Sequence, residues 1–263
     1  MKILYNRNYY KIESKLSEYN VGARKDKNCL INVFIIHAII IDILSDPTKS
    51  SINIQCLDYT QFFDSLKLKK SLLELIETGI DNDEIILIYN ANKEVIMAVK
   101  NGDDLSKKSK VTNVILQGDT LAPLIATVDM DGIAKQWLER AGEQVYKYKN
   151  NIPVGSLGVI DDLLMITKVG VQTTKANAFV NTMTAIKGWQ FGEPKCSNMM
   201  VKNEANDCLS NVIKLDRWKE ERKYGKLVER QEDKMVLKEV DKQKYMGVYI
   251  QNDGKNIATI NEN

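Results

Sequence analysis

The chain has 263 residues, of which 44% are hydrophobic and 27% charged, and its formal net charge is +2. It is long enough to bury a full-sized core, as one large domain or two small ones, and its composition is that of an ordinary globular protein. The balanced charge excludes binding of nucleic acid by bulk positive charge, so any basic surface must come from local clustering of Lys and Arg.

Cysteine and histidine usage argues against a zinc site and against a disulfide scaffold. The chain has one histidine and four cysteines without C-x-x-C spacing: His37, Cys29, Cys56, Cys196 and Cys208. This pattern is typical of a reducing compartment, and we expect an intracellular protein of the nucleus or cytoplasm.

The most apolar stretch runs from Cys29 to Leu44 and is interrupted by Asn32, His37 and Asp42. It is too short and too polar to span a membrane, and it predicts a buried helix instead. We therefore expect no membrane partner.

Hydrophobic periodicity and turn residues place the other elements. Helices are predicted, in chain order, over residues 8–19, 28–45, 64–79, 119–142 and 172–187. Strands are predicted over residues 52–59, 93–100, 109–116, 152–160, 163–167, 195–201 and 244–250. Residues 216–244 are dense in both charge signs and predict a solvated surface or, alternatively, a binding surface. Strands and helices without strict βαβ alternation favour an α+β fold with an antiparallel sheet.

Two carboxylate positions stand out. Asp58 ends the strand predicted over 52–59, and Asp161-Asp162 sit at the turn inside the apolar run GVIDDLLMIT. Like charges in a poorly solvated cleft cannot all stay ionised unless a cation lies between them. Oxygen ligands favour Mg²⁺ or Mn²⁺, and such a site suits phosphoryl transfer by two metal ions. Taken alone, an adjacent aspartate pair is more often a helix cap or a polar turn.

The order of the surrounding motifs favours the metal interpretation, because five motifs in this order resemble the palm motifs of reverse transcriptases. They are CLDYTQFFDSL, LQGDTLAP, GVIDDLLMI, FGEPKC and YMGVYI. The chain is similar to the polymerase of non-LTR (LINE-type) retrotransposons over residues 15–254. The upstream segment YNVGARKDKNCLINVFIIHAII resembles the fingers-to-palm segment of those elements.

The resemblance implies an α+β polymerase palm, an antiparallel sheet backed by helices, with partial fingers. Residues 1–50 would form the partial fingers, 51–203 the palm, and 204–263 a charged connection with a primer-grip hairpin. The implied activity is RNA-directed DNA synthesis, in which an RNA template directs transfer of a nucleotide from a dNTP to a DNA primer with two Mg²⁺ or Mn²⁺ ions.

The resemblance also assigns catalytic roles. Asp58 would bridge both metal ions, with the carbonyl of Tyr59 as an extra ligand. Asp161 would be the invariable metal ligand of the hairpin, and Asp162 would support the site. Lys195 would protonate the departing pyrophosphate or, alternatively, is an ordinary surface lysine.

Further residues are implied for the nucleotide and the primer. Phe63 would crowd the sugar 2′ position and exclude ribonucleotides, or would simply pack in the core. Gln117 and Gly118 would line the nucleotide and template pocket. The primer-grip hairpin would present Tyr245, Met246 and Gly247.

Some positions depart from the family pattern. Phe62 stands where a small residue is common, Ala122 where serine is common, and Val159-Ile160 precede the aspartates in place of an aromatic and a small residue. The fingers hairpin that contacts the triphosphate is expected upstream of Met1. Arg24, Lys25 and Lys27 would partly replace its charge or, alternatively, form an ordinary solvated loop.

No endonuclease motif and little room for a thumb are found, which predicts a fragment of a longer element protein, a truncated or decayed copy. Two alternative functions remain at this stage. One is a remnant that binds nucleic acid without synthesis. The other is a different two-metal enzyme such as a nucleotidyl cyclase, which the Gln117-Gly118 loop and the 245–250 hairpin disfavour.

Overall fold

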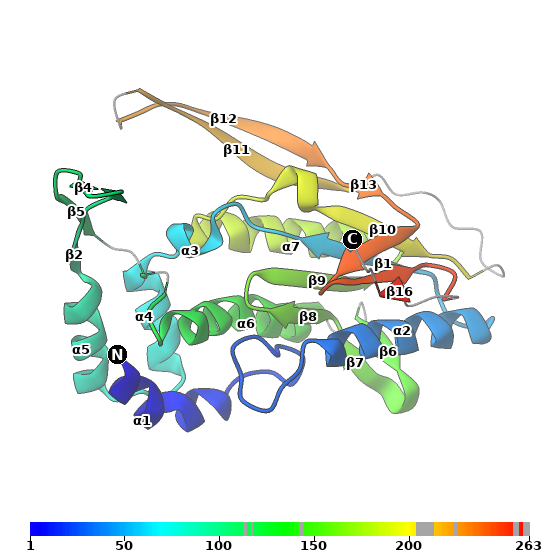
Figure 1. Ribbon diagram of the computed structural model, residues 1–263. Coiled ribbons are helices and arrows are strands. Elements are labelled where there is room, and N and C mark those ends of the chain that lie inside the picture. The colour runs from blue at the N-terminus through cyan, green and yellow to red at the C-terminus, as the bar shows by residue number, and fades with distance from the viewer. Residues whose placement is uncertain are drawn as a thin grey trace.

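The fold, taken from a computed structural model, is built around one five-stranded, mainly antiparallel sheet (Figure 1). The structure describes residues 1–263 apart from 113–114, 117, 142–144, 204–212, 224–225, 255–257 and 260–263. The strand order is β13-β10-β1-β9-β8. These strands are β13 (Lys238–Glu239), β10 (Ser197–Val201), β1 (Ile52–Leu57), β9 (Asp162–Lys168) and β8 (Ser156–Val159). The mixed α/β fold with an antiparallel sheet confirms the predicted class.

Both faces of this sheet are covered, and each face has its own core. One core packs the sheet against α4 (Leu68–Glu77), α6 (Ala122–Ala141) and α7 (Val171–Lys187). The other packs it against α2 (Leu30–Ser45) and the hairpin of β14 (Lys242–Tyr245) and β15 (Val248–Gln251). All six residues of β1 are buried. The alternating side chains of INIQCL therefore point into two packed cores. Neither face of β1 is exposed to solvent.

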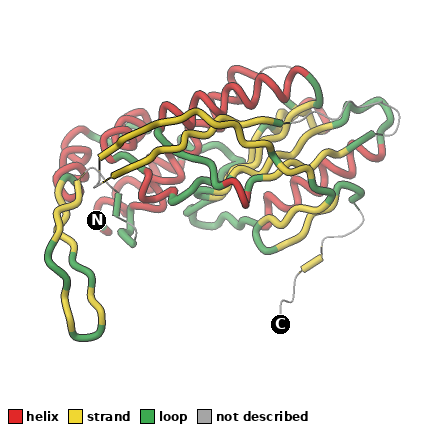
Figure 2. The backbone as a smooth tube through the Cα atoms, turned by 90° about the horizontal axis from the view of Figure 1, so that it is seen from above, coloured by secondary structure: helices red, strands yellow, loops and turns green. Residues whose placement is uncertain are grey.

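The remaining elements lie around this centre. The helices are α1 (Lys2–Glu13), α3 (Phe62–Ser65) and α5 (Asn82–Asn92). The small strands are β2 (Glu94–Met97), β3 (Lys100–Asn101), β4 (Asp104–Leu105), β5 (Ser109–Thr112), β6 (Tyr146–Tyr148), β7 (Ile152–Val154) and β16 (Ala258–Thr259). Strands β2–β5 form an arm that extends away from the body (Figure 2). The long strands β11 (Lys214–Lys223) and β12 (Lys226–Val236) form a second ribbon (Figure 1).

Several predicted elements are confirmed, namely α2, β1, α6, α7, β10 and the strands β2 and β5. The helix predicted over 64–79 is wrong as a single element, because Leu66 is buried with an extended backbone and separates α3 from α4. The helix predicted over 8–19 ends at Glu13, because the chain turns so that Ser17 can donate two hydrogen bonds to Asp131 of α6.

Other elements were not predicted. Helix α5 was missed, although its sequence NDEIILIYNAN carries acidic residues in the first turn. Most of the charged segment 216–244 lies in the β11–β12 ribbon, and the side chains of 216–233 lie outside the described part of the structure. Among the described helices, none combines the length and the apolarity needed to cross a membrane.

Candidate active site

The backbone register of the sheet brings the two predicted aspartate positions together. Leu57, the last residue of β1, pairs with Leu163 of β9. The next residue along each strand at this edge is therefore Asp58 on one side and Asp162 on the other. Because neighbouring strands lie about 4.8 Å apart, the sheet fixes these two carboxylates beside each other.

Asp161 lies in the turn of the β8–β9 hairpin. Val159 pairs with Asp162, which leaves Ile160 and Asp161 as a two-residue turn, so the turn begins one residue earlier than predicted. Ile160 has φ +55°, a left-handed conformation that a β-branched residue rarely adopts. The hairpin tip is thus a strained turn, and such turns persist only where surrounding contacts hold them.

Those contacts come from a segment far upstream. The amide of Val21 donates to the carbonyl of Gly158 at 3.0 Å, and Gly158 donates to the carbonyl of Tyr19 at 3.1 Å, so this segment extends the sheet beyond β8. A Cβ on Gly22 would lie 2.3 Å from the backbone nitrogen of Ile160. Only glycine allows the two chains to come this close. This contact was not predicted, and the glycine in VGAR is its sole signal in the sequence.

Asp58 is enclosed by the loop before β10. Its amide donates to Sγ of Cys196 at 3.4 Å, and its carboxylate Oδ1 lies 3.3 Å from Nζ of Lys195. A Cβ on Gly192 would lie 2.6 Å from Oδ2 of Asp58. The predicted Lys195 is therefore next to the predicted Asp58. Gly192, which was not predicted, makes room for the carboxylate.

The electrostatics of the site show a shortage of positive charge. Burial raises the pKa of Asp162 to about 6, and repulsion from Asp161 and Asp58 adds to this effect. Burial also raises the pKa of Asp161, with further repulsion from Asp58. Lys195 opposes both shifts but is mostly exposed. Such an acidic cluster is stabilised by an added cation.

The donor set fits a hard divalent ion, because it consists of carboxylate oxygens that repel one another. Within the described part of the chain, no three His, Cys, Asp or Glu side chains are arranged as a ready metal site. Oδ1 of Asp58 instead lies 3.3 Å from Nζ of Lys195. Asp58, Asp161 and Asp162 are the residues that would hold the ion.

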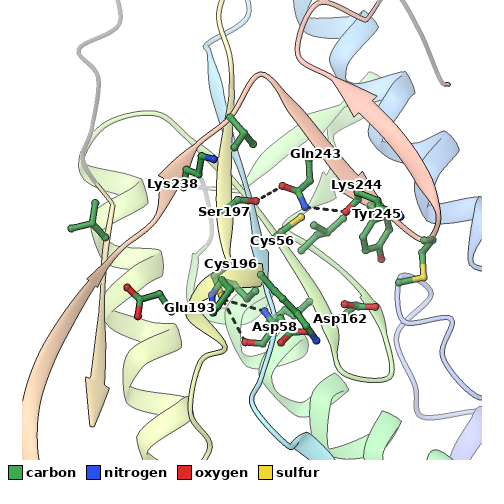
Figure 3. Close-up of a pocket in the computed structure, with 18 residues that line it drawn as sticks. Cys56, Asp58, Asp162, Glu193, Cys196, Ser197, Lys238, Gln243, Lys244 and Tyr245 are labelled. Atoms are coloured by element: carbon green, nitrogen blue, oxygen red, sulfur yellow. Dashed lines mark hydrogen bonds and ion pairs between the residues drawn. The ribbon is translucent and has the colours of Figure 1, made fainter. Parts of the chain in front are cut away.

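A pocket of about 620 Å³ opens beside these residues. Figure 3 shows Asp58 and Asp162 at one end and Gln243, Lys244 and Tyr245 on another wall. The pocket therefore connects the acidic end of the sheet with the β14–β15 hairpin.

The β14–β15 hairpin is tight and well anchored. Met246 and Gly247 both have positive φ, +50° and +77°, as a two-residue type I′ turn requires. Tyr245 is buried, and its hydroxyl accepts a hydrogen bond from Nδ2 of Asn32 at 3.4 Å. The structure thus brings Tyr245 and Met246 to the pocket wall, whereas their role toward a primer stays a prediction.

The aromatic residues after Asp58 divide between core and surface. Phe62 is buried, with its ring 4.8 Å from that of Trp189, so the position expected to be small fills the core. Phe63 is only half-buried. The ring of Tyr59 is buried against Phe191. The roles of Phe63 at the sugar and of the Tyr59 carbonyl at a metal stay predictions.

The remaining predicted positions are the loop of Gln117 and Gly118 and the basic residues near the N-terminus. Gly118 is exposed with φ +92°, just before α6, and Gln117 lies outside the described residues. Arg24 neither lies in a solvated loop nor offers its charge to a triphosphate, so both interpretations are wrong for it. Its side chain is 2% exposed and pairs with Glu13 at 2.7 Å. Lys27 pairs with Glu18.

A family profile and solved structures resemble this chain. The profile of the family described as "Reverse transcriptase (RNA-dependent DNA polymerase)" matches residues 4–250. Apo telomerase from Candida tropicalis, truncated from its C-terminal domain, superposes with a TM-score of 0.62 at 14% identity, covering 98% of this chain and 45% of that one.

Two further telomerase structures, each in complex with a TWJ fragment of telomeric RNA, are also similar. The one from Candida tropicalis has a TM-score of 0.62 at 12% identity, covering 98% of this chain and 37% of that one. The one from Candida albicans has a TM-score of 0.56 at 11% identity, covering 98% and 36%. The chain thus spans less than half of the length of these structures, and at such identities the likeness shows the fold alone. No curated protein matches the sequence.

Proposed function

This chain belongs to the reverse transcriptase family, whose profile spans nearly all of it, and we propose that it is an RNA-directed DNA polymerase of the non-LTR (LINE-type) retrotransposon class. Its substrates would be an RNA template, a DNA primer and dNTPs. The upstream segment YNVGARKDKNCLINVFIIHAII supports the non-LTR assignment, because it resembles the fingers-to-palm segment of those elements. The order of the five motifs and the fold shared with telomerases support a polymerase palm.

One observation carries the proposal. The register of β1 with β9 brings Asp58 beside the hairpin that bears Asp161 and Asp162, and the pKa of Asp162 is raised to about 6 there. A protein that used these residues only as a polar turn would have no reason to collect three carboxylates in a partly buried site, because their repulsion destabilises the fold.

In the proposed reaction, Asp58, Asp161 and Asp162 would hold two ions, Mg²⁺ or Mn²⁺. Bound metal would lower the pKa of the primer 3′-hydroxyl and neutralise charge on the triphosphate and the departing pyrophosphate. The contribution of the chain is mainly to position reactants in a preorganised field. Lys195 would donate a proton to the leaving group, and its exposed position 3.3 Å from Asp58 supports this role.

The other predicted residues complete the proposal. Phe63 would exclude ribonucleotides by its bulk, and Gln117 with Gly118 would approach the incoming nucleotide. Tyr245, Met246 and Gly247 would steady the primer end. We propose that residues 1–50 form partial fingers, 51–203 the palm, and 204–263 a charged connection with the primer-grip hairpin. We also propose an intracellular location in the nucleus or cytoplasm.

A second candidate function is nucleic-acid binding without synthesis. The ion pair between Asp58 and Lys195, at 3.3 Å, favours it, because this contact occupies one of the carboxylates that catalysis requires. In that case the cleft would bind a primer–template but would not recruit metal.

Primer extension separates the two candidates. The full chain is given an RNA template, a DNA primer and dNTPs with Mg²⁺ or Mn²⁺, and is compared with the double variant D161A/D162A. We expect extension by the unaltered chain and its loss by roughly three orders of magnitude in the variant, because two metal ligands are removed.

A matched control uses the other adjacent aspartate pair of the chain. Asp103 and Asp104 are exposed at the tip of the arm, so D103A/D104A should extend the primer at the unaltered rate. Binding of primer–template with no extension at any metal concentration would reject the polymerase and support the second candidate.

A further inference from the structure

A single buried amide connects the two hairpins of the site. Asn32 lies in the first turn of α2 and is fully buried. Its Nδ2 donates to the carbonyl of Gly158 at 3.2 Å and to the hydroxyl of Tyr245 at 3.4 Å. Gly158 lies three residues before Asp161, and Tyr245 ends β14 directly before the turn of its hairpin. One nitrogen therefore touches both hairpins close to their tips.

This amide is unfavourable for stability. Asn32 is a polar residue on the buried face of α2, which otherwise presents Val33, Ile36, Ile39, Ile40 and Ile43. Its Oδ1 is buried and, within the described part of the structure, has no hydrogen-bond partner. A buried acceptor without a partner costs about 1–3 kcal/mol, so an apolar residue of similar size would suit the core better.

Asn32 is also unnecessary for satisfying the carbonyl of Gly158. That carbonyl already accepts the amide of Val21 at 3.0 Å. The hydrogen bond from Asn32 thus links α2 to the hairpin, although the Gly158 carbonyl would have a partner without it. The partner that depends on Asn32 is the hydroxyl of Tyr245, which has no other hydrogen-bond partner among the described residues and whose pKa is raised by burial.

We propose that Asn32 is a positioning residue that fixes the β14–β15 hairpin relative to the hairpin bearing Asp161 and Asp162. This role rests on the proposed function: it sets the distance between the metal-binding carboxylates and the primer end held near Tyr245. Asn32 touches no substrate and acts through Tyr245. An error of about 1 Å in such an alignment can lower the rate of catalysis by two orders of magnitude.

The test uses the full chain and four variants, N32L, Y245F, the double variant N32L/Y245F and the control N8L. Asn8 is a matched control because it is also buried and its Oδ1 likewise has no partner among the described residues, whereas its Nδ2 bonds within its own helix, to the carbonyl of Leu4. The measurements are kcat and the KM for dNTP in primer extension, and amide hydrogen exchange of residues 157–163 and 245–249 without metal.

We expect N32L and Y245F each to lower kcat by about tenfold or more with little change in the KM for dNTP. The double variant should lose no more than the worse single variant, because both remove the same link. Exchange should become faster in both hairpins in N32L, whereas N8L should match the unaltered protein in rate and in exchange at these segments.

Three results would overturn the proposal: N32L with an unaltered kcat, rate losses of N32L and Y245F that multiply, or an equal loss in N8L. If the unaltered chain extends no primer, the proposed function fails, and the exchange data alone then decide: faster exchange in both hairpins supports the link and unchanged exchange rejects it. If N32L does not fold, faster exchange at 157–163 in Y245F supports the link, and unchanged exchange there rejects it.

Discussion

At the scale of single residues, Asp162 shows how the site depends on pH. Its pKa in the folded chain is about 6, against an ordinary value of 3.8. Between these two values the folded state binds more protons than the unfolded state, so stability falls as pH rises through this window. At neutral pH the charge on Asp162 therefore destabilises the metal-free protein.

We predict that D162N is more stable than the unaltered chain by about 1–2 kcal/mol at pH 7.5 without metal, a value reduced for solvent screening. The gain should shrink as pH falls through 6 and vanish near pH 4, where both proteins carry a neutral group. Urea unfolding in the presence of a chelator measures it. Equal stability of D162N and the unaltered chain at pH 7.5 would contradict the raised pKa of Asp162.

Replacing Gly192 with alanine is expected to lower the rate of catalysis without destabilising the fold. Its φ of −85° suits any residue, but a Cβ would lie 2.6 Å from Oδ2 of Asp58. Because the atom in contact is the end of a flexible side chain, G192A should shift the carboxylate at little cost, within about 0.5 kcal/mol, and lower primer extension roughly tenfold or more.

Gly22 provides the contrasting variant. There the new Cβ would meet the backbone nitrogen of Ile160, which cannot move alone. G22A should therefore lose about 1–3 kcal/mol of stability. Thermal unfolding and extension rates measured on both variants test the distinction, and equal unfolding temperatures for G192A and G22A would show it to be wrong.

At the scale of elements, a buried ionic network joins three helices on one face of the sheet. Lys187 at the end of α7 pairs with Asp129 of α6 at 2.7 Å and with Glu74 of α4. Ser71 of α4 also donates to Asp129. Removing the cation would leave a buried carboxylate without a counter-charge.

We predict that K187M loses about 3–5 kcal/mol of stability, as is typical when one partner of a buried ion pair is removed. K175M is the matched control, because Lys175 lies on the same helix and is exposed; its change should stay within about 0.5 kcal/mol. Chemical unfolding of both variants checks this. Similar losses in the two variants would mean that helix α7, and not the ionic network, is the sensitive feature.

At the scale of the whole molecule, metal binding should couple to folding. The three carboxylates come together only when β1 and β9 pair, so the unfolded chain has no equivalent site. Mn²⁺ at about one hundred times its dissociation constant should stabilise the protein by about 2.7 kcal/mol. The unfolding temperature should rise in the unaltered chain and in D103A/D104A, and not in D161A/D162A. An equal rise in all three would show that the ion binds elsewhere.

Much of the fold could be predicted from local sequence. Helices α2, α6 and α7 and strand β1 follow from periodicity, because a long apolar pattern leaves few alternatives. The division of residues 64–79 into α3 and α4 could not be predicted, since it depends on burial of Leu66 by distant elements. The β11–β12 ribbon was missed because dense charge masks the alternation on which strand prediction depends.

From the sequence alone, the motif order identified the aspartates, the lysine and the likeness to reverse transcriptases, because these residues form short local patterns. Only the tertiary structure decided what surrounds them. The close approach of Gly22 to Ile160, the contact of Gly192 with Asp58 and the amide of Asn32 between two hairpins each join segments distant in the chain. Such contacts are set by strand register and by packing on both faces of the sheet, which no local pattern encodes.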